Sequence, residues 1–229
     1  MKRHIVSSSK AVTLIGGGDA KVSQLKEVLG IAPVCVAADS GAELARRANI
    51  PLRAVIGDMD SISADTLSQI PQDRQIIISE QETTDFDKAL RHINAPLIVG
   101  LGFLGGRIDH QLHALHVLAL YAHRPCILVA QTEIVFIAPP AITVPTEPGD
   151  VVSIFPLGPV TGHSQGLEWP IEGLAFDTLS KVGTSNRATG PLTLEMSAPN
   201  AVLMLPHRLI QPVAQALVSE AAVGWPPRA

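Results

Sequence analysis

Proline is distributed unevenly along this chain of 229 residues, and the distribution limits what each part can fold into. Five of the 18 prolines precede residue 139, and the other 13 fall within the last 91 residues. Proline is poorly tolerated inside helices and central strands. We therefore predict helices and buried strands in a first domain, residues 1–138. A second domain, residues 139–229, is predicted to consist of short strands joined by turns.

In the first domain, short apolar runs alternate with stretches of helical spacing. The apolar runs occupy residues 11–15, 34–38, 54–56, 76–78, 97–99 and 126–130. Apolar residues recur every three or four positions in residues 22–29, 42–48, 86–93 and 112–121. Continuously apolar strands that alternate with helices are typical of a parallel sheet covered on both faces. The first domain is thus predicted to be an α/β domain, with a mostly parallel sheet and helices on both faces.

The second domain has a different pattern. Its strand-like stretches lie at residues 141–144, 151–155, 192–196 and 201–205, and turn-forming residues occur at 147–150 and 198–200. This pattern favours an antiparallel sandwich or barrel, and we assign a small all-β sandwich. The last six residues, Gly-Trp-Pro-Pro-Arg-Ala, are predicted to form a loose tail.

Composition excludes several classes of protein. Hydrophobic residues make up 46% of the chain and charged residues 17%, which is unlike a disordered chain. The net charge of −4 gives no basic footprint, so we expect no nucleic-acid partner. No apolar run approaches the roughly 18 residues of a membrane-spanning helix, and no secretory signal is recognisable. Cys35 and Cys126 lie in apolar runs and are read as buried free thiols, so we expect a cytoplasmic protein.

Aspartates follow the predicted strands of the first domain. They are Asp39, Asp58, Asp60, Asp85 and Asp109. In open parallel sheets, ligands bind beyond the carboxyl ends of the strands, so we expect these carboxylates to converge at one edge. Clustered carboxylates need a counter-charge, and all-oxygen ligands favour Mg²⁺. Asp58 and Asp60 would point to the same side of an extended segment and form a metal clamp. The alternative is that these aspartates serve only turns and helix caps.

Cations and glycines accompany the aspartates. Lys88 and Arg107 would clamp a polyphosphate together with Mg²⁺, although Lys88 is equally readable as a solvated helix lysine. Gly105 and Gly106 would let the backbone approach a phosphate closely. The segment Gly-Gly-Gly-Asp at 16–19 predicts a tight turn near a nucleotide, but it lacks the complete dinucleotide-binding and P-loop patterns.

Six short segments occur in an order and spacing typical of one enzyme family. They are Ala-Asp-Ser-Gly-Ala at 38–42, Gly-Asp-Met-Asp-Ser at 57–61, Thr-Asp-Phe-Asp-Lys-Ala-Leu at 84–90, Gly-Gly-Arg-Ile-Asp-His at 105–110, Gly-Leu-Glu-Trp-Pro at 166–170 and Thr-Ser-Asn at 184–186. Together they resemble thiamine pyrophosphokinase. There are three departures from the family pattern: Ser40 stands where a glycine is more usual, Met59 stands where a phenylalanine is usual, and residues 187–190 are not a close match.

The resemblance implies a reaction and an assembly. Such enzymes transfer a pyrophosphoryl group from ATP to the hydroxyethyl oxygen of thiamine, giving thiamine diphosphate and AMP. They are homodimers whose active sites lie between the α/β domain of one subunit and the sandwich of the other. Mg²⁺ and ATP are thus the expected cofactor and co-substrate, and thiamine is the expected acceptor.

The resemblance also implies roles for individual residues of this chain. Asp39, Gly105 and Gly106 would contact the nucleotide, and Asp58, Asp60 and Asp85 would bind the metal. Arg107 would contact phosphates, and Gln81 would contact thiamine. Ser185 and Asn186 would line the thiamine pocket from the partner chain. With Lys88, the cation beside the acidic cluster, we expect Asp85, Asp109 and Arg107 to form the catalytic group, in which either Asp85 or Asp109 would accept the proton of the thiamine hydroxyl.

Two other functions use the same residues. A Mg²⁺-dependent nucleotide phosphohydrolase would share the acidic cluster, but it would form AMP without thiamine. A non-catalytic sensor of thiamine or nucleotide would tolerate the loss of metal-binding carboxylates, and the presence of all five aspartates disfavours it.

Overall fold

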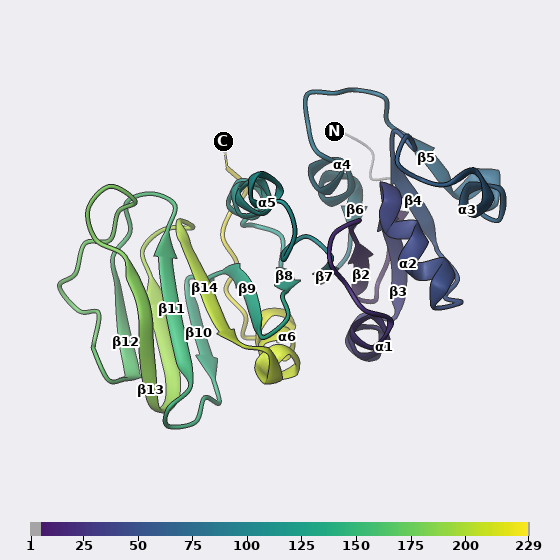
Figure 1. Ribbon diagram of the computed structural model, residues 1–229. Coiled ribbons are helices and arrows are strands. Elements are labelled where there is room, and N and C mark those ends of the chain that lie inside the picture. Colours follow the sequence, from purple (N-terminus) through teal and green to yellow (C-terminus); the bar gives the residue numbers. More distant parts are fainter. Residues whose placement is uncertain (1–5, 229) are drawn as a thin grey trace. The chain divides into compact units, whose positions relative to one another are not determined.

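The parallel strands predicted for the first part of the chain are present in the computed structural model (Figure 1), which describes residues 6–228. The chain divides into two compact units, residues 1–117 and 118–229. In the first unit all strand pairs are parallel among the residues described. The pairs are β2 (Val12–Ile15) with β7 (Ile98–Leu101), β3 (Val34–Ala38) with β4 (Ala54–Gly57), β4 with β5 (Gln75–Ile77), and β1 (Val6–Ser7) with β6 (Ile93–Asn94).

Helices pack against these strands. The first unit contains α1 (Val22–Ile31), α2 (Ala42–Arg47), α3 (Ala64–Ser68), α4 (Asp85–His92) and most of α5 (Ile108–Leu120), together with the 3₁₀ turns η1 (Asp39–Gly41) and η2 (Gln72–Arg74). Every residue of β2, β4 and β7 is buried. Helix α1 packs on β7, α2 on β2 and β3, and α4 on β3 and β4. The four predicted helices are confirmed, and so is the continuous burial of β2, β4 and β7, whereas β5 is only partly buried and its Ile77 is exposed.

Helix α4 begins one residue before the predicted stretch 86–93. The Thr84 side chain caps it by accepting a hydrogen bond from the Asp87 backbone N–H. Asp85 and Asp87 lie in the first turn and Arg91 in the last, which suits the helix dipole. Because the cap fixes the start of the helix, Asp85 projects from its first turn, directly after the segment that follows β5.

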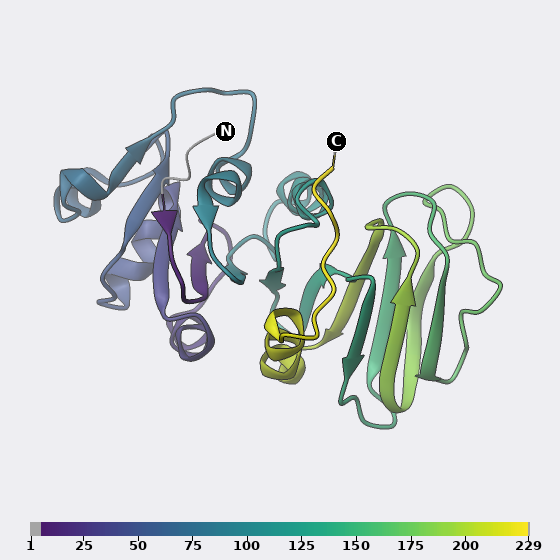
Figure 2. The same ribbon diagram turned by 180° about the vertical axis from the view of Figure 1, so that it is seen from behind.

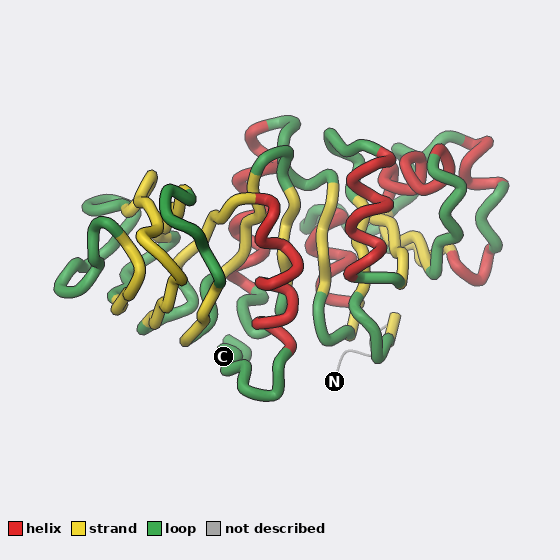
Figure 3. The backbone as a smooth tube through the Cα atoms, turned by 90° about the horizontal axis from the view of Figure 1, so that it is seen from below, coloured by secondary structure: helices red, strands yellow, loops and turns green. Residues whose placement is uncertain are grey.

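The second unit is a pair of antiparallel sheets that share one long strand (Figures 2 and 3). Its strands are β8 (Cys126–Val129), β9 (Glu133–Ile137), β10 (Ala141–Val144), β11 (Val151–Pro156), β12 (Gly162–Leu167), β13 (Gly183–Met196) and β14 (Ala201–Pro206). The first part of β13 pairs with β11, and its last part pairs with β10 and β12. The order continues from β11 through β14 and β9 to β8. The 3₁₀ turn η3 (His207–Leu209) leads into α6 (Ile210–Val218), which packs on β10.

The division between the units lies between residues 117 and 118, whereas proline usage placed the domain boundary at 138 and 139. The β8–β9 hairpin explains the difference. Strand β9 pairs with β14 from Glu133 to Ile137, so the hairpin packs with the later strands although it precedes the proline-rich segment. A functional boundary at residue 138 stays a prediction.

The C-terminal segment is held in place, contrary to the loose tail predicted from its sequence. The Trp225 indole N–H donates a hydrogen bond to the Ala138 carbonyl at 2.8 Å. The Arg228 guanidinium donates to the carbonyls of Ala119 at 3.0 Å and Pro199 at 3.3 Å. Proline and glycine in this segment rule out a helix, but they do not prevent side chains from anchoring it.

Cys35 and Cys126 are both buried free thiols, as predicted, and burial raises the pKa of each to about 12. Among the residues that the structure describes, no helix has both the length and the apolar character needed to cross a bilayer.

Glu43 braces α2 against the start of α3. It accepts hydrogen bonds from the Ser63 backbone N–H at 3.0 Å, the Ser63 hydroxyl at 2.7 Å and the Thr66 hydroxyl at 2.7 Å. These bonds, above all that from the Ser63 hydroxyl, hold the pKa of Glu43 at about 2, below its ordinary value of 4.5. The carboxylate therefore stabilises the folded state only while it is ionised.

Glu43→Gln is expected to lower the free energy of unfolding at pH 7 by about 1–2 kcal/mol, because an amide N–H₂ would face hydroxyl donors. A group whose folded pKa is depressed contributes stability above its unfolded pKa and loses it as the pH falls through the folded pKa. The difference in the free energy of unfolding between wild type and variant should thus have its largest value above pH 4.5 and decrease as the pH falls toward 2. Urea unfolding at pH 7 and pH 3 measures it, and an equal difference at both would contradict this role.

Candidate active site

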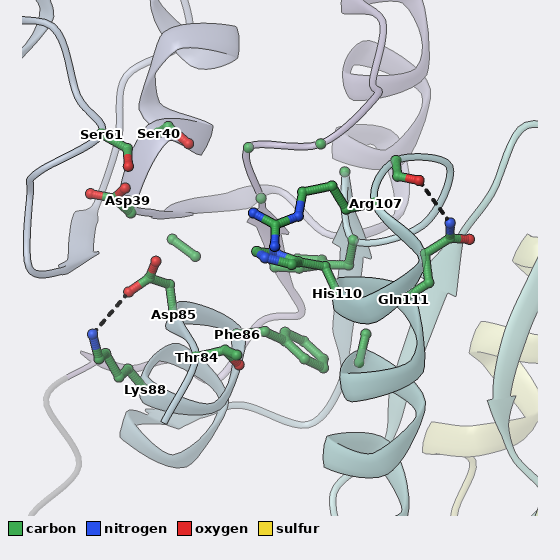
Figure 4. Close-up of a pocket in the computed structure, with 18 of the residues that line it drawn as sticks. Asp39, Ser40, Ser61, Thr84, Asp85, Phe86, Lys88, Arg107, His110 and Gln111 are labelled. Carbon is green, nitrogen blue, oxygen red and sulfur yellow. Dashed lines mark hydrogen bonds and ion pairs between the residues drawn. The ribbon is translucent and has the colours of Figure 1, made fainter. Parts of the chain in front are cut away.

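A cavity of about 690 Å³ lies at the carboxyl ends of the parallel strands of the first unit. Most of its lining residues belong to the segments that follow β2, β3, β4, β5 and β7, within residues 16–18, 39–40, 58–61, 81–86 and 102–107. This is the edge at which open parallel sheets bind ligands. In Figure 4, Asp39, Ser61 and Asp85 lie on one side of the cavity, and Arg107 and His110 lie on the other.

Three of the predicted aspartates meet on one wall of this cavity. One carboxylate oxygen from each of Asp39, Asp58 and Asp60 lies within 4.8 Å of the others. Asp39 is buried, and among the described residues none forms a hydrogen bond with its Oδ1 atom. Burial raises the pKa of the Asp39 carboxyl, and the charges of Asp85 and Asp58 raise it further. An unpartnered buried oxygen within an all-oxygen donor set fits a hard divalent cation such as Mg²⁺.

Backbone geometry brings Asp58 and Asp60 together in a way that the sequence analysis did not predict. Met59 between them has φ +68°, so the chain turns here and is not extended. The Asp60 backbone N–H donates to Asp58 Oδ1 at 3.4 Å, and the Ser61 hydroxyl donates to Asp60 Oδ1 at 2.8 Å. The carboxylates thus share one side because of a left-handed residue between them, and Ser61 helps to orient the second.

Lys88 is a buried member of the acidic cluster. Its side chain is 2% exposed, and its Nζ lies 3.1 Å from Asp58 Oδ2 and 3.2 Å from Asp85 Oδ1. Burial opposes the charged forms of these groups. The hydrogen bond from Lys88 nevertheless holds the pKa of Asp58 below its usual range, whereas burial keeps the pKa of Asp85 above its usual range. The solvated-lysine reading is therefore wrong, since this ammonium group faces carboxylates.

Gln81 reaches the same carboxylate from the segment before α4. Its Nε2 donates to Asp58 Oδ2 at 3.1 Å, so that oxygen accepts bonds from both Gln81 and Lys88. At the end of the same segment, Thr84 Oγ1 lies 3.1 Å from His113 Nδ1 of α5. Neither contact was predicted, because each joins residues more than 20 positions apart.

Asp109 does not join the three-aspartate group. It pairs with Arg107, whose Nη2 lies 2.6 Å from Asp109 Oδ2 and whose Nε lies 3.2 Å from Oδ1. Both side chains are largely exposed, at 62% and 73%. The hydrogen bond from Arg107 lowers the pKa of Asp109. Of this pair, Arg107 lines the cavity, where it lies beside His110 (Figure 4).

Glycines keep the opposite wall open to a ligand. Gly105 has φ +82°, and a Cβ at Gly106 would meet nothing within 4 Å among the described atoms. A Cβ at Gly17 would lie 2.0 Å from the Ser40 hydroxyl oxygen, and one at Gly18 would lie 2.6 Å from the Gly102 carbonyl. The segment at 16–19 therefore packs closely against η1 and the turn after β7, which explains the run of glycines.

In the second unit, Asn186 fixes the loop that carries Trp169. Its Nδ2 donates to the Trp169 carbonyl at 2.7 Å, and its Oδ1 accepts from the Trp169 backbone N–H at 3.2 Å. Trp169 itself is 53% exposed and offers a flat apolar surface. Ser185 precedes Asn186 on β13 with φ +60°, and its backbone N–H donates to the Ser153 hydroxyl. The predicted pair Ser185 and Asn186 thus lies next to an exposed aromatic residue that the sequence analysis did not single out as a site.

Comparisons with known proteins agree on one family. Residues 25–129 match the family described as thiamin pyrophosphokinase, catalytic domain. Thiamine pyrophosphokinase 3 of Oryza sativa subsp. japonica is 28% identical over 149 residues, which span 57% of this chain and 56% of that protein. The match thus covers just over half the length of this curated relative.

Solved structures share the fold. The thiamin pyrophosphokinase from Candida albicans has a TM-score of 0.74 at 18% identity, covering 86% of this chain and 89% of that one. The enzyme from Geobacillus thermodenitrificans gives 0.70 at 23% identity, covering 86% and 96%. Yeast thiamin pyrophosphokinase gives 0.70 at 14% identity, covering 92% and 94%. The mixed sheets and helices of this chain therefore follow an architecture that all three structures have.

Proposed function

We propose that this chain, which matches the thiamin pyrophosphokinase catalytic-domain family over residues 25–129, transfers a pyrophosphoryl group from ATP to thiamine, giving thiamine diphosphate and AMP. The observation that carries this proposal is the cavity at the strand ends, in which the carboxylates of Asp39, Asp58 and Asp60 meet. A polyphosphate with its cation needs such a group, and a cavity of about 690 Å³ is of the size that holds small-molecule ligands.

We propose Asp39, Asp58 and Asp60 as the residues that hold Mg²⁺. The sequence analysis assigned Asp85 to the metal and Asp39 to the nucleotide. Asp39 is favoured because its oxygen belongs to the three-carboxylate group, whereas Asp85 hydrogen-bonds to Lys88. When bound, the ion would neutralise charge that develops on the phosphates during transfer.

Asp85 is the better candidate for the base that accepts the proton of the thiamine hydroxyl. It lines the cavity, and burial raises its pKa, which makes the carboxylate more basic. Asp109, the alternative, is exposed and held by Arg107. Lys88 would keep Asp58 and Asp85 in place, and Gln81 would face the thiamine.

Phosphate contacts are proposed for the opposite wall. Arg107 lines the cavity there, together with the glycines at 16–18 and Gly106, and the adjoining Gly105 gives that turn its left-handed conformation. A guanidinium and closely approachable backbone are the usual means of binding phosphate. The buried free thiols Cys35 and Cys126 favour a reducing compartment, so we propose the cytoplasm as the location.

The experiment that tests the function is mass spectrometry of a reaction with thiamine, ATP and Mg²⁺. We expect thiamine diphosphate and AMP in equal amounts, and no turnover after a chelator removes the metal. AMP without thiamine would indicate a nucleotide phosphohydrolase. Binding of thiamine or nucleotide without any product would indicate a sensor.

A composite active site in a homodimer is the second part of the proposal. Ser185 and Asn186 would serve the site of the partner chain, next to the exposed Trp169. Mixing an Asp85→Asn protein with an Asn186→Ala protein, each inactive alone, is expected to restore about a quarter of wild-type activity. Random mixing makes about half the dimers mixed, and each mixed dimer has one intact site.

The control for this mixing experiment is native mass spectrometry of the mixture. It establishes that subunits have exchanged before activity is measured. If verified mixed dimers remain inactive, each site is built within one chain.

A further inference from the structure

Four hydrogen-bond donors converge on the Glu80 carboxylate, outside the group of residues assigned to the reaction. Its Oε2 accepts from the backbone N–H groups of Glu82 at 2.9 Å and Thr83 at 3.1 Å. Its Oε1 accepts from the Thr83 hydroxyl and from Nη2 of Arg91. The same Arg91 nitrogen lies 3.3 Å from Thr83 Oγ1. One carboxylate therefore closes the turn after β5 and ties it to the last turn of α4.

The segment that this carboxylate closes is one wall of the cavity. We call residues 80–84 the 80–84 loop. Gln81, Thr83 and Thr84 all line the cavity, and Gln81 donates a hydrogen bond to Asp58 Oδ2 at 3.1 Å. Thr84 at the other end of the loop caps α4. The loop end at Thr84 is thus fixed by the helix, whereas Gln81 depends on the bonds that its neighbour Glu80 makes.

Asp58 does not depend on the loop in the same way. Its Oδ2 also accepts from Lys88 at 3.1 Å, and its Oδ1 accepts from the Asp60 backbone N–H at 3.4 Å. Loss of the Gln81 bond would leave both of these in place. The proposed metal site therefore has its own support, and disturbance of the 80–84 loop should affect the part of the cavity that Gln81 faces.

The Glu80–Arg91 ion pair is suited to hold the loop against α4 at all times. The two side chains are 34% and 20% exposed, so water screens them only in part. Above all the Thr83 hydroxyl, and also Arg91, lower the pKa of Glu80 to about 2, so the carboxylate is ionised at any physiological pH. The pair is therefore always charged when substrate arrives.

We propose that Glu80 and Arg91 are positioning residues for the acceptor substrate: they hold the 80–84 loop so that Gln81 is in place before thiamine binds. This inference rests on the proposed function, because it takes thiamine as the acceptor. A loop that is ordered in advance adds affinity, since its ordering entropy is not lost on binding. Without the Glu80–Arg91 pair, the loop would lose conformational entropy when thiamine binds, and the affinity for thiamine would fall.

The test compares Glu80→Gln, Arg91→Gln and the double variant with wild type. We expect each to raise the KM for thiamine by about tenfold and to change the KM for ATP and the kcat by no more than about twofold. The double variant should resemble the single ones, because both remove the same contact. Arg91→Lys keeps a cation and should remain within about threefold of wild type. A merely structural brace would lower stability without separating the two KM values.

The matched control is Asp65→Asn, which removes the 3.0 Å ion pair between Arg46 and Asp65. That pair joins α2 to α3, and neither residue lines the cavity. Its kinetic constants should be those of wild type. Thermal melting of all variants shows whether a change in KM arises from unfolding, and Arg91→Lys provides the least disruptive variant.

Hydrogen exchange at the backbone amides of residues 81–84 gives a readout without activity. Exchange should become faster in Glu80→Gln and Arg91→Gln, and unchanged exchange would overturn the brace. Equal increases in both KM values, or an unchanged KM for thiamine in an active enzyme, would overturn the positioning role. A wild type that makes no thiamine diphosphate would instead overturn the proposed function, and with it the assignment of thiamine to this wall.

Discussion

Asp60→Asn is expected to lower turnover by at least about a hundredfold while leaving the free energy of unfolding within about 0.5 kcal/mol of wild type. Asp60 is exposed, and its negative charge lies close to the carboxylates of Asp39 and Asp58. The neutral amide of asparagine would therefore remove the repulsion between these charges as well as a metal ligand. The measurements are kcat with saturating substrates, Mg²⁺ affinity by calorimetry and urea unfolding.

Asp58→Asn should lose turnover to the same extent but also lose stability, by about 1–3 kcal/mol. The difference arises because Asp58 accepts bonds from both Lys88 and Gln81, whereas Asp60 accepts one from Ser61. The pair of variants thus separates the metal role from the structural role. Near-normal turnover in both would reassign Asp58 and Asp60 to a structural turn.

Lys88→Met is expected to lower the free energy of unfolding by about 2–3 kcal/mol. The substitution keeps a long side chain but leaves Asp58 and Asp85 close together without the ammonium group between them. Removal of one partner from a buried ion pair usually costs more, but Asp85 is 35% exposed, and water reduces the penalty. Urea unfolding in metal-free buffer measures this change.

Mg²⁺ provides the internal check on the Lys88 prediction. Because the cation would supply some of the missing counter-charge, it should stabilise Lys88→Met more than it stabilises the wild type. Lys88→Arg keeps the charge and should lose less stability than Lys88→Met. A Lys88→Met protein as stable as wild type in metal-free buffer would contradict the role of this lysine.

The convergence of aspartates could be predicted because it depends on local signals. Short apolar runs mark buried strands, and the carboxyl ends of parallel strands share an edge. Asp39, Asp58 and Asp60 follow such runs and meet as expected. Asp109 was included by the same rule, but it lies in the exposed first turn of α5 and pairs with Arg107 two residues earlier. The position of Asp109 was thus determined by the nearby cation Arg107 more than by its place after a strand.

Burial of a charged residue could not be predicted. In the sequence, Lys88 has the position of an ordinary helical lysine three residues after Asp85. Its Nζ contact with Asp58 joins residues 30 positions apart, and only the packing of α4 on β4 creates it. The Glu80–Arg91 pair escaped notice for the same reason, since 11 residues separate a loop from a helix end.

The second unit shows where strand patterns fail. Residues 192–196 were predicted as a strand, but β13 begins at Gly183 and includes Gly190 and Pro191. The first part of β13 and the whole of β12 are largely polar. Neither shows the alternation of apolar and polar residues from which strands were predicted. They become strands because they find hydrogen-bond partners in the fold: β13 pairs with β11, and β12 pairs with β13.

The close packing of Gly17 on Ser40 means that substitutions at these two positions are not independent. A methyl group at residue 17 would overlap the Ser40 hydroxyl at 2.0 Å, and the serine would have to rotate away to make room. With glycine at residue 40, that obstacle would be absent. With serine at residue 40, alanine at residue 17 therefore requires a change of the serine rotamer. Positions 17 and 40 are thus coupled, since the side chain present at one decides which side chains fit at the other.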